Sequence, residues 1–246
     1  MTLRDAMQGL GENPLYWLER RRQWRGMRSS LLVLGLLCCA CGHSLAFVLA
    51  PAFAAMAILH DKRTRLWDDL LLTRLTSEEI VLAMVAAALQ IPAMLLSVQA
   101  ALVLIALVGG ICHTEPAGTP WLECLRGLVV MLPTLVTGIV AAASFLVVGG
   151  LIGIRAGLHF RDTFGGVAGA LLGTLAVGAL VVAAGVLTTP RMIHPGEALS
   201  RVLSPLGSAG LWAAMSLETA LLALLNALLA SLLWRACVRA VRPAGS

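Results

Sequence analysis

Polar side chains inside long apolar runs are the first candidates for chemistry in this sequence. Glu218 lies about two turns into the last apolar run, and Asn226 follows on a similar helical face. Gln90 and Gln99 add two amides to an earlier apolar run. A carboxylate inside a membrane costs a few kcal/mol when it is charged and unpaired, so it marks a function by default. These residues indicate either an intramembrane polar site for a proton or cation, or a carboxyl group that is hydrogen-bonded between packed helices.

Motifs for other chemistry are missing. A nucleotide-binding P-loop needs a lysine followed by serine or threonine, whereas Lys62, the only lysine, is followed by Arg63. The sequence holds no HExxH or GxSxG motif, and its histidines and cysteines lack the spacing of metal ligands. We therefore expect a protein that is not an enzyme and that binds no cofactor or metal itself. Any ATP hydrolysis, with its ATP and Mg²⁺, is expected on a partner chain.

A charged and amphipathic segment, residues 61–80, interrupts the apolar sequence as DKRTRLWDDLLLTRLTSEEI. Apolar residues recur in it at three- and four-residue steps, which predicts a short helix with one apolar stripe. Such a stripe lies either in the headgroup layer of a membrane or in a groove on another protein. The stripe consists of Trp67, Leu70, Leu71 and Leu75, and the opposite side carries Asp68, Asp69, Arg74, Glu78 and Glu79.

The composition predicts a helical membrane protein. Of 246 residues, 59% are hydrophobic and 13% are charged, about half the charged fraction of an average soluble domain. The apolar runs are continuous and do not alternate, which favours helices over a β-barrel. At about 20 residues for each span, the length accommodates six transmembrane helices. The predicted spans are a hairpin of two within 29–59, then 80–107, 125–152, 165–187 and 211–233.

The basic residues favour the hairpin over one long span in 29–59. With two spans there, 15 of the 18 basic residues fall on the side that holds both termini. With a single span the basic residues divide equally, nine on each side. Because cytoplasmic loops carry the excess of arginine and lysine, we expect six spans and two cytoplasmic termini. The domain organisation is then an N-terminal segment (1–28), a transmembrane domain (29–236) containing the segment 61–80, and a short cytoplasmic tail (237–246).

The N-terminal segment predicts a second membrane-associated element. Asn13 is a suitable helix cap before Pro14, because a proline at the first helical position loses no hydrogen bond. Trp17 and Trp24 lie seven residues apart on one face, and arginines such as Arg20 occupy much of the rest. This pattern is typical of a helix in the headgroup layer, with indoles at the interface and guanidinium groups near anionic lipid.

Two motifs resemble permease subunits of ABC-2 type exporters. The stretch NPLYWLERR, residues 13–21, is similar to the motif that forms an elbow helix before the first span in that family. The run LLLTRLTSEEI, residues 70–80, resembles the family's LLLTPLS run and the glutamate and isoleucine that open its third span, with Arg74 in place of the proline. The matching residues of this second motif are Leu70, Leu71, Leu72, Thr73, Leu75, Thr76, Glu79 and Ile80.

The resemblance implies a permease subunit in a bacterial cytoplasmic membrane that forms half of a translocation pathway. Its partners would be membrane lipid, a second permease subunit in a homodimer or heterodimer, and a cytoplasmic P-loop ATPase, with no role for nucleic acid. The segment 61–80 would be a coupling helix between spans two and three that docks on the ATPase. The implied ATPase-docking residues are Trp67, Leu70, Leu71, Thr73, Arg74, Leu75, Glu78 and Glu79, with leucines in the buried contact and Arg74 and both glutamates at its rim.

Two other classes of function remain open from the sequence. A stand-alone proton- or ion-coupled carrier would use Glu218 and the polar face of the third span. A membrane scaffold would transport nothing.

Overall fold

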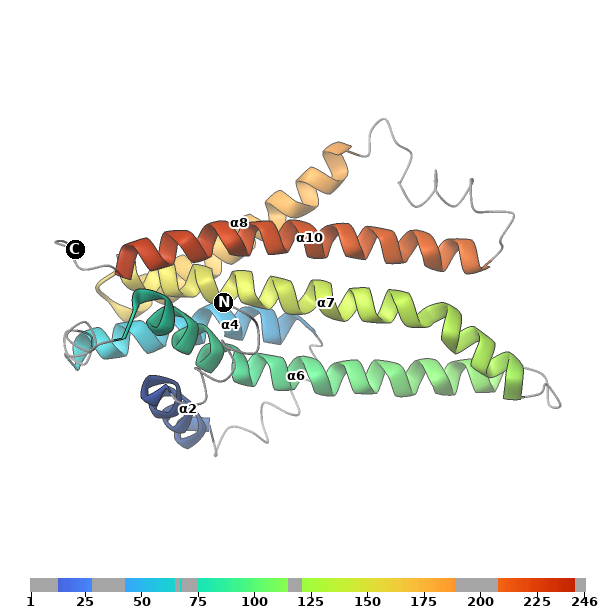
Figure 1. Ribbon diagram of the computed structural model, residues 1–246, viewed down its shortest axis with the longest axis horizontal. Helices are drawn as coiled ribbons and strands as arrows, with labels where there is room; N and C mark the ends of the chain where they lie inside the picture. Colours follow the sequence, from blue (N-terminus) through green and yellow to red (C-terminus); the bar gives the residue numbers. More distant parts are fainter. Residues whose placement is uncertain are drawn as a thin grey trace. The chain divides into compact units, whose positions relative to one another are not determined.

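The computed structural model describes residues 13–27, 43–64, 67, 75–114, 121–188 and 208–241. These residues form six α-helices, and no strand occurs among them, which confirms the predicted all-α class. Figure 1 shows the helices in chain order. They are α2 (Pro14–Met27), α4 (His43–Arg63), α6 (Ser77–Thr114), α7 (Trp121–His159), α8 (Thr163–Thr188) and α10 (Ser208–Val241).

Four of these helices contain segments that are long and apolar enough to cross a membrane: Ser77–Ile105, Met131–His159, Thr163–Leu180 and Met215–Val241. They correspond to the predicted third to sixth spans, so the chain is an integral membrane protein. The helix α4 occupies the second half of the predicted hairpin, whereas residues 29–42 lie outside the described part of the chain. The hairpin and the total of six spans therefore stay predictions.

The helices extend further than the sequence predicts. The helix α7 continues through His159, so Arg155 and His159 lie on its last turns, beyond residue 152 where the predicted span ends. The helix α10 continues to Val241, and Cys237, Val238 and Val241 are buried. The expected tail at 237–246 is therefore partly helix, because the apolar side chains on this last turn pack into the core.

The helices contribute to two compact units. The first unit comprises residues 1–96, 146–176 and 228–246, and the second comprises 97–145 and 177–227. The first unit holds α2, α4, the start of α6, the end of α7, the start of α8 and the end of α10. Basic residues at these helix ends, including Lys62, Arg155 and Arg235, therefore belong to the first unit.

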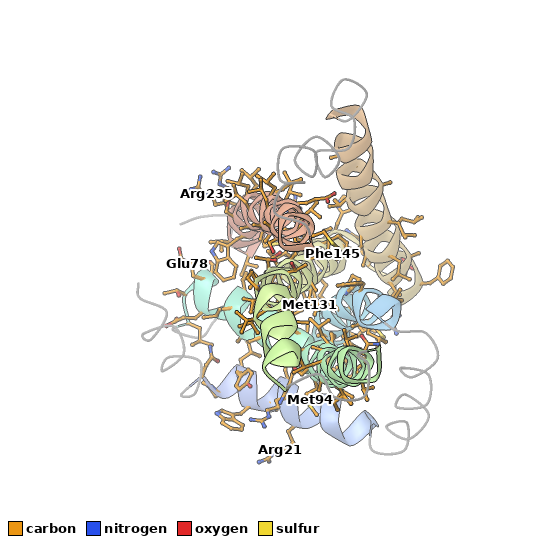
Figure 2. All side chains as sticks on the ribbon, turned by 90° about the vertical axis from the view of Figure 1, so that its right-hand side faces the viewer. Arg21, Glu78, Met94, Met131, Phe145 and Arg235 are labelled. Carbon is orange, nitrogen blue, oxygen red and sulfur yellow. The ribbon has the colours of Figure 1, made fainter. Side chains whose placement is uncertain are left out.

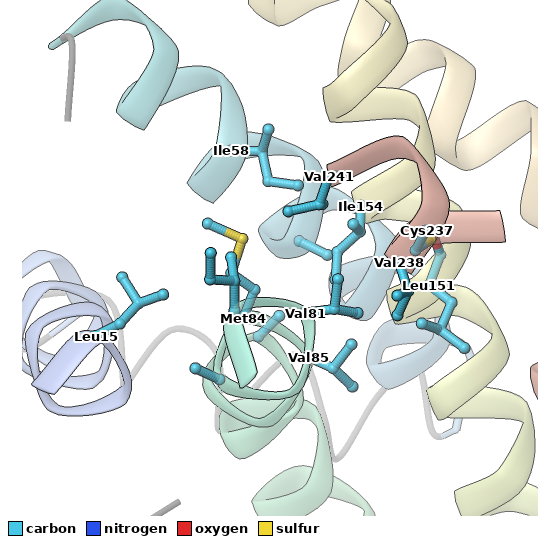
Figure 3. Close-up of a cluster of buried hydrophobic side chains, with 14 residues drawn as sticks. Leu15, Ile58, Val81, Met84, Val85, Leu151, Ile154, Cys237, Val238 and Val241 are labelled. Atoms are coloured by element: carbon cyan, nitrogen blue, oxygen red, sulfur yellow. The ribbon is translucent and has the colours of Figure 1, made fainter. Parts of the chain in front are cut away.

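The core of the first unit surrounds α4. Its alanines and Ile58 are almost completely buried, and residues from α2, α6, α7 and α10 complete the same cluster. Figure 3 shows Ile58 with Val81 and Met84 of α6, Ile154 of α7 and residues of the last turn of α10. The helix α4 is therefore a central packing element of this unit.

Small residues bring α4 close to α7. Gly149, Gly153 and Gly157 recur every four residues along α7 and face α4. A Cβ atom at Gly153 would lie 2.8 Å from the Cβ of Ala54 and 2.9 Å from the Cα of Pro51. Ordinary carbon contacts are about 3.5–4.0 Å, so only glycine permits this approach. This small-xxx-small ladder was not predicted from the sequence, although its four-residue spacing is the signal.

The helix α8 packs in a similar way. A Cβ atom at Gly173 would lie 2.8 Å from the side chain of Ile152 on α7, and one at Gly169 would lie 2.5 Å from the Phe160 ring. Leu59 of α4 covers Gly166. These glycines therefore serve packing within the chain, between α8 and its neighbours.

In the second unit, hydroxyl pairs join α7 to α10. The Oγ1 atom of Thr134 lies 2.7 Å from the Oγ of Ser216, and the hydroxyl groups of Thr137 and Thr219 are 2.5 Å apart. Both pairs are separated by 82 residues in the chain, so the two helices run in the same direction. Two spans that are separated by one returning span, here α8, must run in the same direction.

Candidate functional site

The segment 61–80 ends in a capping box that starts α6. The carboxylate of Glu79 accepts hydrogen bonds from the backbone N–H of Thr76 at 2.7 Å and from its hydroxyl at 2.9 Å. The Glu79 N–H donates in return to the Thr76 hydroxyl oxygen at 3.3 Å. This exchange satisfies N–H groups that have no partner within the helix. Glu79 is therefore engaged in holding the start of α6.

Asn13 connects this helix start to α2. Its Oδ1 atom accepts the Leu15 N–H at 3.0 Å, which confirms Asn13 as the cap of a helix that begins at Pro14. Its Nδ2 group donates to the backbone carbonyl of Glu79 at 3.4 Å. Leu15 is buried in the same cluster as Ile80 and Met84. One buried amide side chain thus ties the start of α2 to the start of α6.

The two ends of the predicted apolar stripe face inward. Trp67 and Leu75 both pack against the core of the first unit, and Glu78 is exposed on the first turn of α6. Figure 2 shows Glu78 pointing outward from this turn. The other predicted docking residues, Leu70, Leu71, Thr73 and Arg74, lie outside the described residues.

The outer face of α2 combines aromatic, aliphatic and basic side chains. Trp17 and Leu18 are each about half exposed, at 49% and 51%. The Arg20 guanidinium lies 4.9 Å from the centre of the Trp17 ring, a cation–π contact. Figure 2 shows Arg21 directed away from the unit. Pro14 is exposed as well, and the Trp24 side chain lies outside the described residues.

Lys62 has a role that was not predicted from the sequence. Its ammonium group donates hydrogen bonds to the backbone carbonyls of Gly157 at 2.8 Å, Leu158 at 2.6 Å and Phe160 at 3.5 Å. These carbonyls close α7, where a positive charge also interacts favourably with the helix dipole. Burial, and next the charge of Arg161, lower the pKa of Lys62 below 10.5. A lone lysine on the last turn of an apolar helix was the available signal.

The candidate intramembrane polar residues do not form one site in the second unit. Glu218 is exposed on α10, whereas Asn226 is buried and its Nδ2 group donates to the Ala141 carbonyl at 3.5 Å. Eight residues advance a helix by about 80° beyond two full turns, which places these side chains on different faces. Gln99 is buried in the second unit, and Gln90 is half-buried in the first. Among the described residues, no group of three histidine, cysteine, aspartate or glutamate side chains is placed to hold a metal ion.

Comparison with models of known protein families finds no match, and comparisons with curated proteins and with solved structures likewise find none.

Proposed function

We propose that this chain is a permease subunit of an ATP-driven exporter that resembles the ABC-2 type. It would form half of the translocation pathway together with a second permease subunit, and a separate cytoplasmic ATPase would hold ATP and Mg²⁺. The observation that best supports this proposal is the anchoring of Trp67 and Leu75 against one core. Only seven residues lie between these two anchors, so the intervening leucine run is tethered at both ends to the membrane helices.

The anchoring divides the predicted docking residues into two groups. Trp67, Leu75 and Glu79 support the segment, because their side chains already contact this chain. The residues that remain for the ATPase are Leu70 and Leu71 as the buried contact and Thr73, Arg74 and Glu78 as the rim. A coupling segment anchored on both sides would transmit a displacement better than a free one, because less binding free energy is lost in ordering it.

The helix α2 would be the interfacial elbow of this permease. Its half-exposed Trp17 and Leu18 and its stacked Arg20 suit the boundary between headgroups and acyl chains. The excess of basic residues in the first unit would place that unit at the cytoplasmic side of a bacterial inner membrane, with both termini inside.

A stand-alone carrier built on Glu218 is less well supported. Such a carrier needs its carboxyl group among other polar side chains in the helix bundle. In the second unit, Glu218 is exposed on α10, whereas Asn226 is buried and its Nδ2 group donates to the Ala141 carbonyl, so the two do not share one polar site.

Co-purification tests the proposal. The detergent-solubilised wild type is expected to bring down an ATPase that carries a P-loop, and Leu71→Asp is expected to lose it. Leu72→Asp is the matched control, because Leu72 lies beside Leu71 and off the predicted stripe. Recovery of no such ATPase by abundant, folded wild type would refute the proposal. Equal recovery by both variants would refute the docking stripe.

A further inference from the structure

The end of α4 and the end of α7 are joined in two independent ways. Along their length, Gly153 and Gly157 of α7 approach the backbone of α4 at Pro51 and Ala55. At their ends, Lys62 lies one residue before the end of α4 and donates to three carbonyls that close α7. The glycine contacts align the two helices, and Lys62 fixes their ends to each other.

The three hydrogen bonds to carbonyl groups are directional, and their common donor is the charged ammonium group of Lys62. Hydrogen bonds of charged donors are worth roughly twice those of neutral pairs. Phe160, which accepts the longest of them, lies directly before Arg161 and Asp162, and Asp162 caps α8 through the Gly165 N–H at 2.5 Å. A displacement of Lys62 would therefore reach the last turn of α7 and the start of α8 together.

The geometry points to Lys62 as a positioning residue that passes movement of the segment 61–80 to the turn between α7 and α8. This inference rests on the proposed function, because the movement would come from the docked ATPase. Lys62 would act through the backbone carbonyls that it contacts at the end of α7.

Three substitutions separate this role from general stability. Lys62→Met keeps the apolar stem and removes every donor. Lys62→Arg retains the charge and donors, and we expect it to restore the coupling at least in part. Arg63→Met is the matched control, because it removes a neighbouring positive charge that is exposed and leaves the contacts of Lys62 in place.

The readout is amide hydrogen exchange across residues 155–166 in the full chain bound to its co-purified ATPase, with and without a non-hydrolysable ATP analogue. In wild type and Arg63→Met, the analogue is expected to change exchange in this turn by at least about ten-fold, the lower limit of the effect of one charged hydrogen bond. In Lys62→Met, the ATPase should still bind while the nucleotide-dependent change disappears.

The outcomes distinguish the two proposals. A nucleotide-dependent change in Lys62→Met that equals the wild-type change would overturn the role of Lys62 and leave the proposed function intact. The absence of any ATPase from the wild-type preparation would overturn both. If Lys62→Met does not fold, Lys62→Gln, which removes the charge and keeps a polar side chain, is held to the same criterion.

Discussion

The close approach of α4 and α7 predicts a large effect from adding one methyl group at Gly153. In Gly153→Ala, the new Cβ would meet the Pro51 carbonyl oxygen, lie 2.8 Å from the Cβ of Ala54 and lie 2.9 Å from the Cα of Pro51. Those atoms belong to the backbone or its first side-chain carbon, so no rotamer change can move them away. The two helices must separate by about 1 Å to restore ordinary carbon contacts. Overpacking of this kind costs about 1–3 kcal/mol.

Gly138→Ala is the matched control on the same helix. A Cβ at Gly138 would have no atom within 4 Å, so the substitution should gain up to about 1 kcal/mol of helix propensity. Unfolding of the purified protein by sodium dodecyl sulfate in mixed micelles measures both free energies. We expect the two substitutions to change the unfolding free energy in opposite directions. Equal effects at the two positions would refute the packing of α7 against α4.

Three further predictions concern the described contacts. A double-mutant cycle of Thr137→Val and Thr219→Val should give a coupling of about 0.6 kcal/mol in the same titration, and a coupling of zero would contradict the hydroxyl pair. Because the pKa of Lys62 is lowered from 10.5 in the folded protein, the unfolded chain holds this proton over a pH window just below 10.5 in which the folded protein releases it. The free energy of unfolding should therefore rise with pH across that window. The melting temperature of wild type should show this rise, whereas that of Lys62→Arg should not. Parallel pH profiles of the two proteins would contradict this. Asn13→Ala removes the cap of α2 and the hydrogen bond to the Glu79 carbonyl, at a cost of about 1–2 kcal/mol. Trypsin should therefore cut the arginine-rich α2 faster in this variant. An unchanged cutting rate would show that the cap does not hold the helix.

The long apolar helices were predictable because each is a continuous run with recognisable ends. Asn13 before Pro14 predicts the start of α2, and the structure confirms that cap. The ends of α7 and α10 were predicted too early, since the predicted spans stop at residues 152 and 233, before Arg155 and Arg235. Both helices continue because apolar residues beyond these arginines, such as Val238, still face the core.

The contacts of the candidate site were less predictable, because amphipathic spacing indicates an apolar face but not the surface against which that face packs. Leu75 shares the predicted stripe with Leu71, yet it packs against this chain's own core. The role of Lys62 depends on carbonyl groups about 95 residues later in the chain, which local patterns do not reveal. Glu218 and Asn226 were expected on one face, and the accumulated rotation of the helix separates them.

The most direct test of the central claim is a photo-crosslink from the leucine run in living cells. A photoreactive amino acid at Leu71 is expected to capture an ATPase with a P-loop, identified by mass spectrometry of the cross-linked peptide. The same amino acid at Leu72 should capture much less of it. Cross-links from Leu71 to lipid or to this chain alone, in cells where the protein is abundant and folded, would contradict the proposal that the chain is an ATPase-coupled permease subunit.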